Sequence, residues 1–119
     1  MKLIIAIIRP ERLDAVQDEL QAVLDEDENY RLTVDHVQGH GRQLGDVEYV
    51  RGQPVRPRLL DKLRLMLAVN DPFLDRAIDA IILGARTAGD GAVGDGKIMV
   101  MPLDDVIRIR TGERGPKAV

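Results

Sequence analysis

The sequence predicts an α+β domain in which two helices cover one face of an antiparallel sheet. The main observation is a repeat: the 119-residue chain runs twice through a strand, a helix that starts at a proline, and a second strand. A second observation is the length, which gives residues 1–119 enough apolar residues for one domain with its own core. The chain has no cysteine, which excludes a disulfide framework, a cysteine-based metal site and a cysteine nucleophile.

The first half begins with Lys2–Ile8, a continuous apolar run that suits a buried strand. Pro10 follows, and apolar residues then recur at helical spacing, which predicts an amphipathic helix of about four turns. Its apolar stripe consists of Leu13, Val16, Leu20 and Val23. The acidic run Asp25–Glu28 is predicted to be a loop, and Tyr30–Gln38 the second strand.

The second half opens with a long segment, from Gly39 to Leu60, that lacks a clear periodicity. It contains four glycines and two prolines, and only Val47–Val50 is able to extend briefly. Such a long stretch without regular structure is uncommon inside a compact domain unless it serves a function or is disordered. We therefore expect a functional loop here.

The next elements are a strand at Lys62–Val69 and a second helix. Asn70 or Asp71 is expected to cap that helix, with Pro72 at its first position. The apolar stripe then continues to about Ala85, through Leu74, Ala77, Ile78, Ile81 and Ile82.

The last strand is expected at Ile98–Pro102, and the tail, residues 104–119, is expected to end in mobile polar residues. Two β-α-β units in about 100 residues are typical of the ferredoxin-like βαββαβ sandwich, an antiparallel sheet with two helices on one face. Because this fold serves many activities, the function has to be inferred from the sites that it carries.

Composition excludes several classes of function. The net charge of −3 argues against a general nucleic-acid binder, and aromatic residues make up only 3% of the chain, too few for base stacking on the strands. His36 and His40 are four residues apart, but His36 is expected in a strand and His40 in a glycine-rich segment, and this spacing brings two side chains to one metal ion only on a helix. No targeting signal or long apolar run is present, so we expect a cytoplasmic protein that does not insert into a membrane.

The glycine loop, Ala88–Lys97, has the sequence AGDGAVGDGK. Its glycines can adopt positive φ and let backbone N–H groups converge on an anion, most often a phosphate. Gly91–Lys97 also satisfies G-x-x-x-x-G-K, but a P-loop then needs Ser or Thr and a helix, whereas Ile98–Met101 is strand-like. We therefore expect an anion cradle rather than a Walker A site, and a flexible turn is the alternative interpretation.

Basic residues of the tail extend this prediction. Arg108 and Arg110 would point to one face if their segment is extended, and together with Lys97 they would neutralise a diphosphate or triphosphate. The alternative interpretation is a set of unrelated surface bases beside a loop.

Several stretches resemble the PII signal-transduction family, the nitrogen regulatory PII-like proteins. They follow one another in the family's order and span nearly the whole chain: Ile4–Pro10, Gly39–Gly45 with Arg51-Gly52, Gly94–Ile98, and Arg108–Glu113. The resemblance implies a non-enzymatic homotrimer with the ferredoxin-like fold that binds ATP or ADP, with or without Mg²⁺, in clefts between subunits. It also implies three functional segments: a T-loop at about 39–61, a B-loop at about 87–97 and a C-loop in the tail, 104–119.

The resemblance also implies site residues. The phosphates would be held by Gly94, Asp95, Gly96 and Lys97, and by Arg108 and Arg110 of the neighbouring subunit. The nucleotide and effector side would be lined by Thr33, Gly41, Arg42 and Gln43. Gln43 would contribute to a Mg²⁺ site through its amide oxygen, a hard ligand that suits this ion. Gln43 and Lys62 would bind 2-oxoglutarate.

The sequence departs from the family in its central loop. Val50 and Val55 stand where many bacterial members carry a tyrosine that is uridylylated, so no covalent modification is expected there. The tip, Arg51–Arg58, is basic and rich in proline, which indicates a different partner transporter or enzyme. The glycine loop is also longer than usual, and Met66 replaces a residue that is usually acidic.

Two other functions stay open from the residues alone. One is an enzyme that hydrolyses or transfers nucleotides, although the chain lacks an evident positioned base. The other is a ferredoxin-like module that binds a small molecule without nucleotide.

Overall fold

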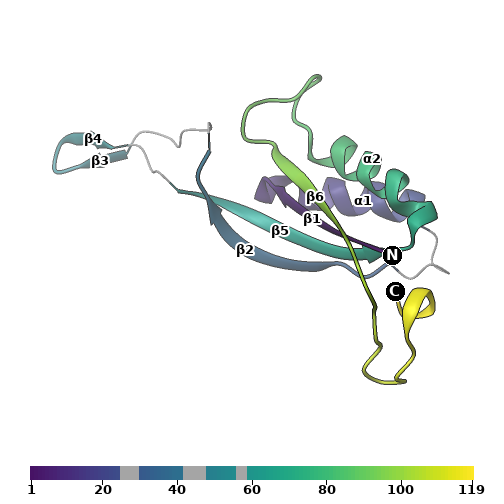
Figure 1. The fold of residues 1–119 in the computed structure, drawn as a ribbon. Helices are drawn as coiled ribbons and strands as arrows, with labels where there is room; N and C mark the ends of the chain where they lie inside the picture. Colours follow the sequence, from purple (N-terminus) through teal and green to yellow (C-terminus); the bar gives the residue numbers. More distant parts are fainter. Residues whose placement is uncertain (25–29, 42–47, 56–58) are drawn as a thin grey trace.

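The computed structural model describes residues 1–24, 30–41, 48–55 and 59–119. Its main sheet has four strands in the order β2-β5-β1-β6, and all neighbours are antiparallel. These strands are β1 Lys2–Ile8, β2 Thr33–Gly39, β5 Leu60–Val69 and β6 Gly96–Pro102. Helices α1, Leu13–Val23, and α2, Leu74–Ala85, lie together on one face of the sheet (Figure 1). The predicted fold class, a ferredoxin-like α+β sandwich, is confirmed.

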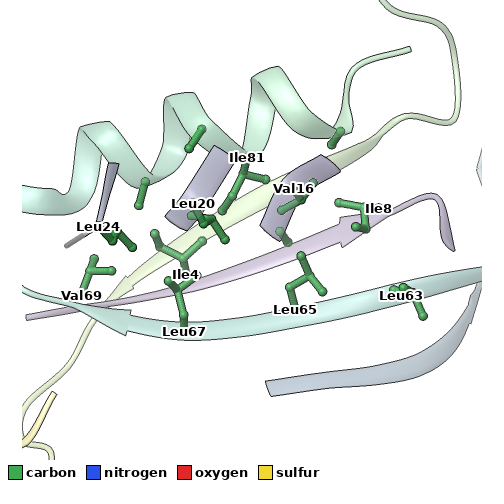
Figure 2. Close-up of a cluster of buried hydrophobic side chains, with 14 residues drawn as sticks. Ile4, Ile8, Val16, Leu20, Leu24, Leu63, Leu65, Leu67, Val69 and Ile81 are labelled. Atoms are coloured by element: carbon green, nitrogen blue, oxygen red, sulfur yellow. The ribbon is translucent and has the colours of Figure 1, made fainter. Parts of the chain in front are cut away.

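The core lies between this face and the two helices. Alternate residues of β1 and β5 point toward the helices, where Val16, Leu20 and Ile81 meet Ile4, Leu65 and Leu67 (Figure 2). The remaining residues of β1, Leu3, Ile5 and Ile7, lie on the opposite, helix-free face and are only partly buried. The continuous apolar run of β1 therefore serves two faces, of which this chain itself covers one.

The two helices pack closely at Gly84. A Cβ atom placed on Gly84 would lie 2.6 Å from the Cα atom of Val16, closer than real atoms approach. In addition, Arg12 Nε donates a hydrogen bond to the Gly84 carbonyl at 2.9 Å. Glycine at this position therefore sets the distance between α1 and α2.

Both helices begin differently from the prediction. Each is preceded by a 3₁₀ turn, at Pro10–Arg12 and at Asp71–Phe73, with the proline in the first turn. The expected cap of α2 by Asn70 or Asp71 is wrong, since neither side chain makes a capping hydrogen bond. Asn70 instead donates to the Pro116 carbonyl, and the Asp71 carboxylate accepts a bond from the N-terminal amine at 2.8 Å. Both side chains are used in contacts with distant segments.

The central loop contains a hairpin that periodicity did not predict beyond Val47–Val50. Strands β3, Glu48–Val50, and β4, Gln53–Val55, pair around Arg51 and Gly52, whose φ angles are 53° and 80°. Positive φ at both turn residues is the requirement of a type I′ turn, which joins the strands of many two-residue hairpins. The hairpin projects far from the main sheet (Figure 1), and the molecule accordingly measures 59 × 31 × 21 Å.

Several further boundaries differ from the prediction. Strand β5 begins at Leu60 rather than Lys62, and β6 begins at Gly96 rather than Ile98. Strand β2 begins at Thr33 rather than Tyr30. The tail does not end in a loose segment: it closes a small hairpin through an Ile107–Arg114 bridge and ends in a 3₁₀ turn, where Ala118 is 7% exposed. Figure 1 shows this tail beside the N-terminus, at the end of the sheet remote from the β3–β4 hairpin.

Candidate functional site

The glycine loop between α2 and β6 has the positive φ angles that its sequence predicts. Gly89, Gly91, Gly94 and Gly96 all have φ between 69° and 112°. The Asp95 N–H bonds the Ala92 carbonyl at 3.2 Å, which closes a turn with Gly94 at its third position. At Gly96 a Cβ atom would lie 1.7 Å from the Ile7 carbonyl oxygen, so only glycine fits beside β1.

The carboxylate of Asp95 holds this loop in shape. Oδ2 accepts bonds from the backbone N–H groups of Thr87 at 3.0 Å and Ala92 at 2.9 Å. Oδ1 accepts the Thr87 hydroxyl at 2.7 Å and Arg9 Nε at 3.0 Å. Burial opposes ionisation, but these donors outweigh it and hold the pKa of Asp95 well below its ordinary value. The Asp95 side chain therefore fixes the loop, and Asp95 also lines the cleft described below.

Arg9 joins the loop to the end of β1. Besides its bond to Asp95, its Nη2 donates to the Val93 carbonyl at 2.9 Å. Sequence reasoning did not single out Arg9 as a site residue, because the partners are more than 80 positions away. The sequence feature that could have indicated Arg9 is its position directly before a proline at the end of the first strand.

Lys62 connects the same loop to β5. Its ammonium group donates to the Gly94 carbonyl at 2.6 Å. Burial and the nearby positive charge of Arg9 both lower the pKa of Lys62. Arg9 is balanced by the Asp95 carboxylate, so Lys62 provides the remaining positive charge at the base of the glycine loop, which favours an anion there.

A cleft of about 720 Å³ runs between this loop and the start of the central loop. It is lined by six of the predicted site residues: Gly41, Lys62, Gly94, Asp95, Gly96 and Lys97. His40 and Arg64 also reach it. Two motifs that are separated by about fifty positions in the sequence thus meet at one cleft. Arg42 and Gln43 lie outside the described residues, and Gln43 is the expected Mg²⁺ ligand.

Thr33 lies on the opposite edge of the sheet from Lys97. It is on β2, and Lys97 is on β6, so three strand spacings separate them, about 14 Å. Thr33 is exposed, on the helix-free face. The chain by itself does not bring Thr33 to the glycine loop.

The tail arginines are likewise remote from the glycine loop of their own chain. Lys97 pairs with Ile7, whereas Pro102 pairs with Lys2, so the five steps between them carry the chain about 17 Å along β6 before the tail begins. The condition for Arg108 and Arg110 to share a face, an extended segment, is not met, since Ile109 and Arg110 are in a turn. Arg108 Nη2 donates to the Lys117 carbonyl at 3.2 Å, and Arg110 is exposed.

Within the described residues, no three His, Asp or Glu side chains gather in a way that would hold a metal ion. His36 is exposed on β2 and His40 lines the cleft. At the projecting hairpin, Tyr49 is 74% and Val50 54% exposed, so both are open to a partner protein. Among the described helices, none has the length and apolar character needed to span a membrane.

Comparisons with known proteins place these features in context. A family model described as "Nitrogen regulatory protein P-II" matches residues 1–113. Nitrogen regulatory protein GlnK1 of Methanosarcina mazei is 52% identical over all of this chain and 97% of its own length. Nitrogen regulatory protein P-II of Rhizobium etli is 42% identical over the full length of both chains. Among solved structures, Arabidopsis thaliana PII bound to citrate is similar with a TM-score of 0.74 and 34% identity, over 98% of this chain and 87% of that one.

Proposed function

Because the chain belongs to the nitrogen regulatory P-II family, whose members are signal transducers rather than enzymes, we propose that it senses adenine nucleotides in the cytoplasm. ATP or ADP, with or without Mg²⁺, binds in the cleft under the glycine loop. Binding changes how the central loop engages a partner protein, a membrane transporter or a metabolic enzyme.

The observation that carries this proposal is the cleft that joins the two motifs. Arg9, Asp95 and Lys62 fix the glycine loop beside Gly41, and Lys97 is the last residue of that loop. Backbone N–H groups in a glycine-rich turn, with ammonium and guanidinium groups beside them, form a favourable environment for phosphate oxygens. These features support phosphate binding rather than catalysis.

A homotrimer would complete the cleft. The glycine loop, Gly41 and Lys62 form one half, and Thr33, Arg108 and Arg110 are remote from it in the same chain. A neighbouring subunit would supply this second half. The helix-free sheet face supports the assembly, because the strand register gathers a set of apolar residues there: Leu3, Ile5, Ile7, Met66, Met99 and Met101. Met99 is 40% and Met101 42% exposed in the single chain, and a contiguous apolar face of this kind marks an interaction surface.

The same cleft offers a place for a carboxylate effector. Lys62 lies at its wall as a cation, and 2-oxoglutarate would use it together with Gln43, which would also contribute its amide oxygen to Mg²⁺. That the Arabidopsis PII was solved bound to citrate supports carboxylate binding within this family.

The central loop would convey the signal. The β3–β4 hairpin stands away from the sheet (Figure 1), and the loop's two ends frame the cleft at Gly41 and Leu60. A ligand in the cleft acts only to the extent that it prefers one arrangement of this loop over another. Tyr49, Val50 and Arg51 are exposed at the hairpin, which supports a partner that presents apolar and acidic groups.

Calorimetry of ATP and ADP, each with and without Mg²⁺ and 2-oxoglutarate, tests the proposal. Lys97→Ala should weaken nucleotide binding at least tenfold, since a charge-assisted contact contributes about 1.5–3 kcal/mol. Lys2→Ala is the matched control, because Lys2 lies at the other end of the sheet and pairs with Asp71. Gln43→Ala should abolish the 2-oxoglutarate effect and leave ADP binding intact.

Three results would contradict the proposal. Equal nucleotide affinities for Lys97→Ala and Lys2→Ala would exclude the glycine loop as the phosphate site. No binding of ATP or ADP at millimolar concentration would favour a module without nucleotide. Sustained phosphate release from ATP, lost on Lys97→Ala, would identify an enzyme instead.

A further inference from the structure

A second cavity, of about 580 Å³, lies on the other side of the glycine loop, between that loop and α2. Its walls are mainly isoleucine and alanine, from α2, β1 and β6: Ile7, Ile8, Ile78, Ile82, Ala85 and Ile98. Ala92, Val93 and Lys97 line both this cavity and the cleft, so one loop separates the two spaces. The apolar cavity therefore adjoins the proposed phosphate site, and the glycine loop lies between the two.

The rim of the cavity is open and carries charge. Ile82 is 37% and Val93 58% exposed, so the apolar surface is accessible from outside. Arg86 and Asp90 also line the cavity, and both are exposed. An occupant with an apolar centre would match these walls, and the opposite charges of Arg86 and Asp90 leave the rim without a strong net charge.

The tail presents such a group. Ile109 is 100% exposed, at the tip of a hairpin that is closed by hydrogen bonds from Arg108 N to Glu113 O at 2.9 Å and from Gly112 N to Arg108 O at 2.8 Å. Arg108 and Arg110 flank it directly. The hairpin therefore holds a fully exposed isoleucine between two arginines in the sequence.

The proposed trimer brings these two features together. If Arg108 and Arg110 of one subunit reach phosphates beside Lys97 of the next, the residue between them arrives at Lys97 as well. The apolar cavity also adjoins Lys97. Continuity with that contact selects a second copy of this chain as the occupant, and the Asp90 carboxylate offsets Arg86 at the rim, so the rim is not wholly basic toward the arginines of the tail.

We propose that Ile109 of each subunit inserts into the apolar cavity between α2 and the glycine loop of its neighbour. This inference rests on the proposed function. Ile109 is then a positioning residue: it makes no contact with nucleotide and anchors the two arginines that do. The same contact would connect nucleotide binding to the packing of α2.

Because the chain has no cysteine, disulfide trapping tests the contact without background. The variant Ile109→Cys with Ile82→Cys should form intersubunit disulfides under mild oxidation, seen as covalent dimers and trimers on non-reducing gels. A disulfide needs Cα atoms about 4.4–6.8 Å apart, so it reports direct contact. The matched control is Ile109→Cys with Leu83→Cys, since Leu83 is the next residue of α2, is 65% exposed and does not line the cavity.

A second variant measures the consequence for binding. Ile109→Ser should lower ATP affinity about tenfold, while Ile109→Leu should keep it, because leucine restores the apolar anchor. Since Ile109 is fully exposed in the single chain, neither change is expected to affect folding.

The outcomes separate this inference from the proposed function. Selective trapping of the Ile82 pair, with loss of affinity in Ile109→Ser alone, supports the contact. A trimer that binds ATP, but forms equal disulfides with both pairs or none with either, overturns the inference and leaves the proposed function intact. A parent protein that is monomeric and binds no nucleotide overturns both.

Discussion

Replacing Asp95 with asparagine isolates the clamp that shapes the glycine loop. The carboxylate accepts four hydrogen bonds, two on each oxygen, from Thr87, Ala92 and Arg9. The amide keeps one oxygen and turns an NH₂ group toward the other two donors, so two bonds to a charged group are lost. Each such bond contributes about 1.5–3 kcal/mol, and because the loop is able to relax toward solvent we expect the lower end, a total of about 3 kcal/mol.

Urea unfolding at fixed protein concentration measures this loss, since an assembled protein has a concentration-dependent stability. Asp104→Asn is the control: Asp104 is exposed and makes no ion pair with the described residues, so its replacement should change stability by less than about 0.5 kcal/mol. ATP affinity should fall in Asp95→Asn as well, because the loop that carries Gly94 and Lys97 loses its shape. Equal unfolding midpoints for the two variants would refute the role of Asp95 as a clamp.

Two other predictions concern the pH dependence of the Asp95 contacts and the close packing of α1 and α2 at Gly84. The pKa of Asp95 is lowered in the folded chain, so its stabilising contribution is complete above the ordinary value of 3.8 and is lost as the pH falls below it. The parent should therefore lose more stability than Asp95→Asn between about pH 5 and pH 2; parallel losses would show that this carboxylate is not selectively stabilised. Gly84→Ala should lower the melting temperature by several degrees without changing ADP affinity, because a Cβ atom would push α1 from α2. An unchanged melting temperature in calorimetry would show that the helices tolerate the extra carbon.

Apolar runs and periodicity predicted the main elements of the fold, because β1 and β5 bury every second residue and each helix buries one stripe. In α1 the buried Val16 and Leu20 fall on the expected stripe, and β6 confirmed that the glycine loop leads into a strand rather than a helix. The hairpin β3–β4 escaped prediction, because Pro54 suggests a break. Pro54 stands opposite Tyr49, next to the hydrogen-bonded pair that closes the turn, where a strand residue needs no donor.

The sequence motifs predicted the candidate site, but they did not predict the side-chain contacts that hold the glycine loop in place. Glycine spacing indicated the loop, whereas the Arg9–Asp95 contact joins residues 86 positions apart and leaves no periodic signal. The tail was misjudged for a similar reason, since polar composition suggested mobility. In the structure Arg114 pairs with Asp105, and Asn70 bonds the Pro116 carbonyl. Such long-range polar contacts depend on tertiary structure and cannot be inferred from local composition.

Complementation between two defective subunits tests most directly whether the nucleotide cleft is shared. Lys97→Ala and Arg110→Ala should each bind ATP at least tenfold more weakly than the parent when measured alone. The two variants are then unfolded, mixed in equal amounts and refolded. About a quarter of the clefts should combine an intact lysine from one subunit with an intact arginine from its neighbour, since each of the two subunits is the required variant with a chance of about one half. Calorimetry should then recover parent-like affinity in that fraction. Absence of any high-affinity site in the mixture would contradict a cleft built from two subunits.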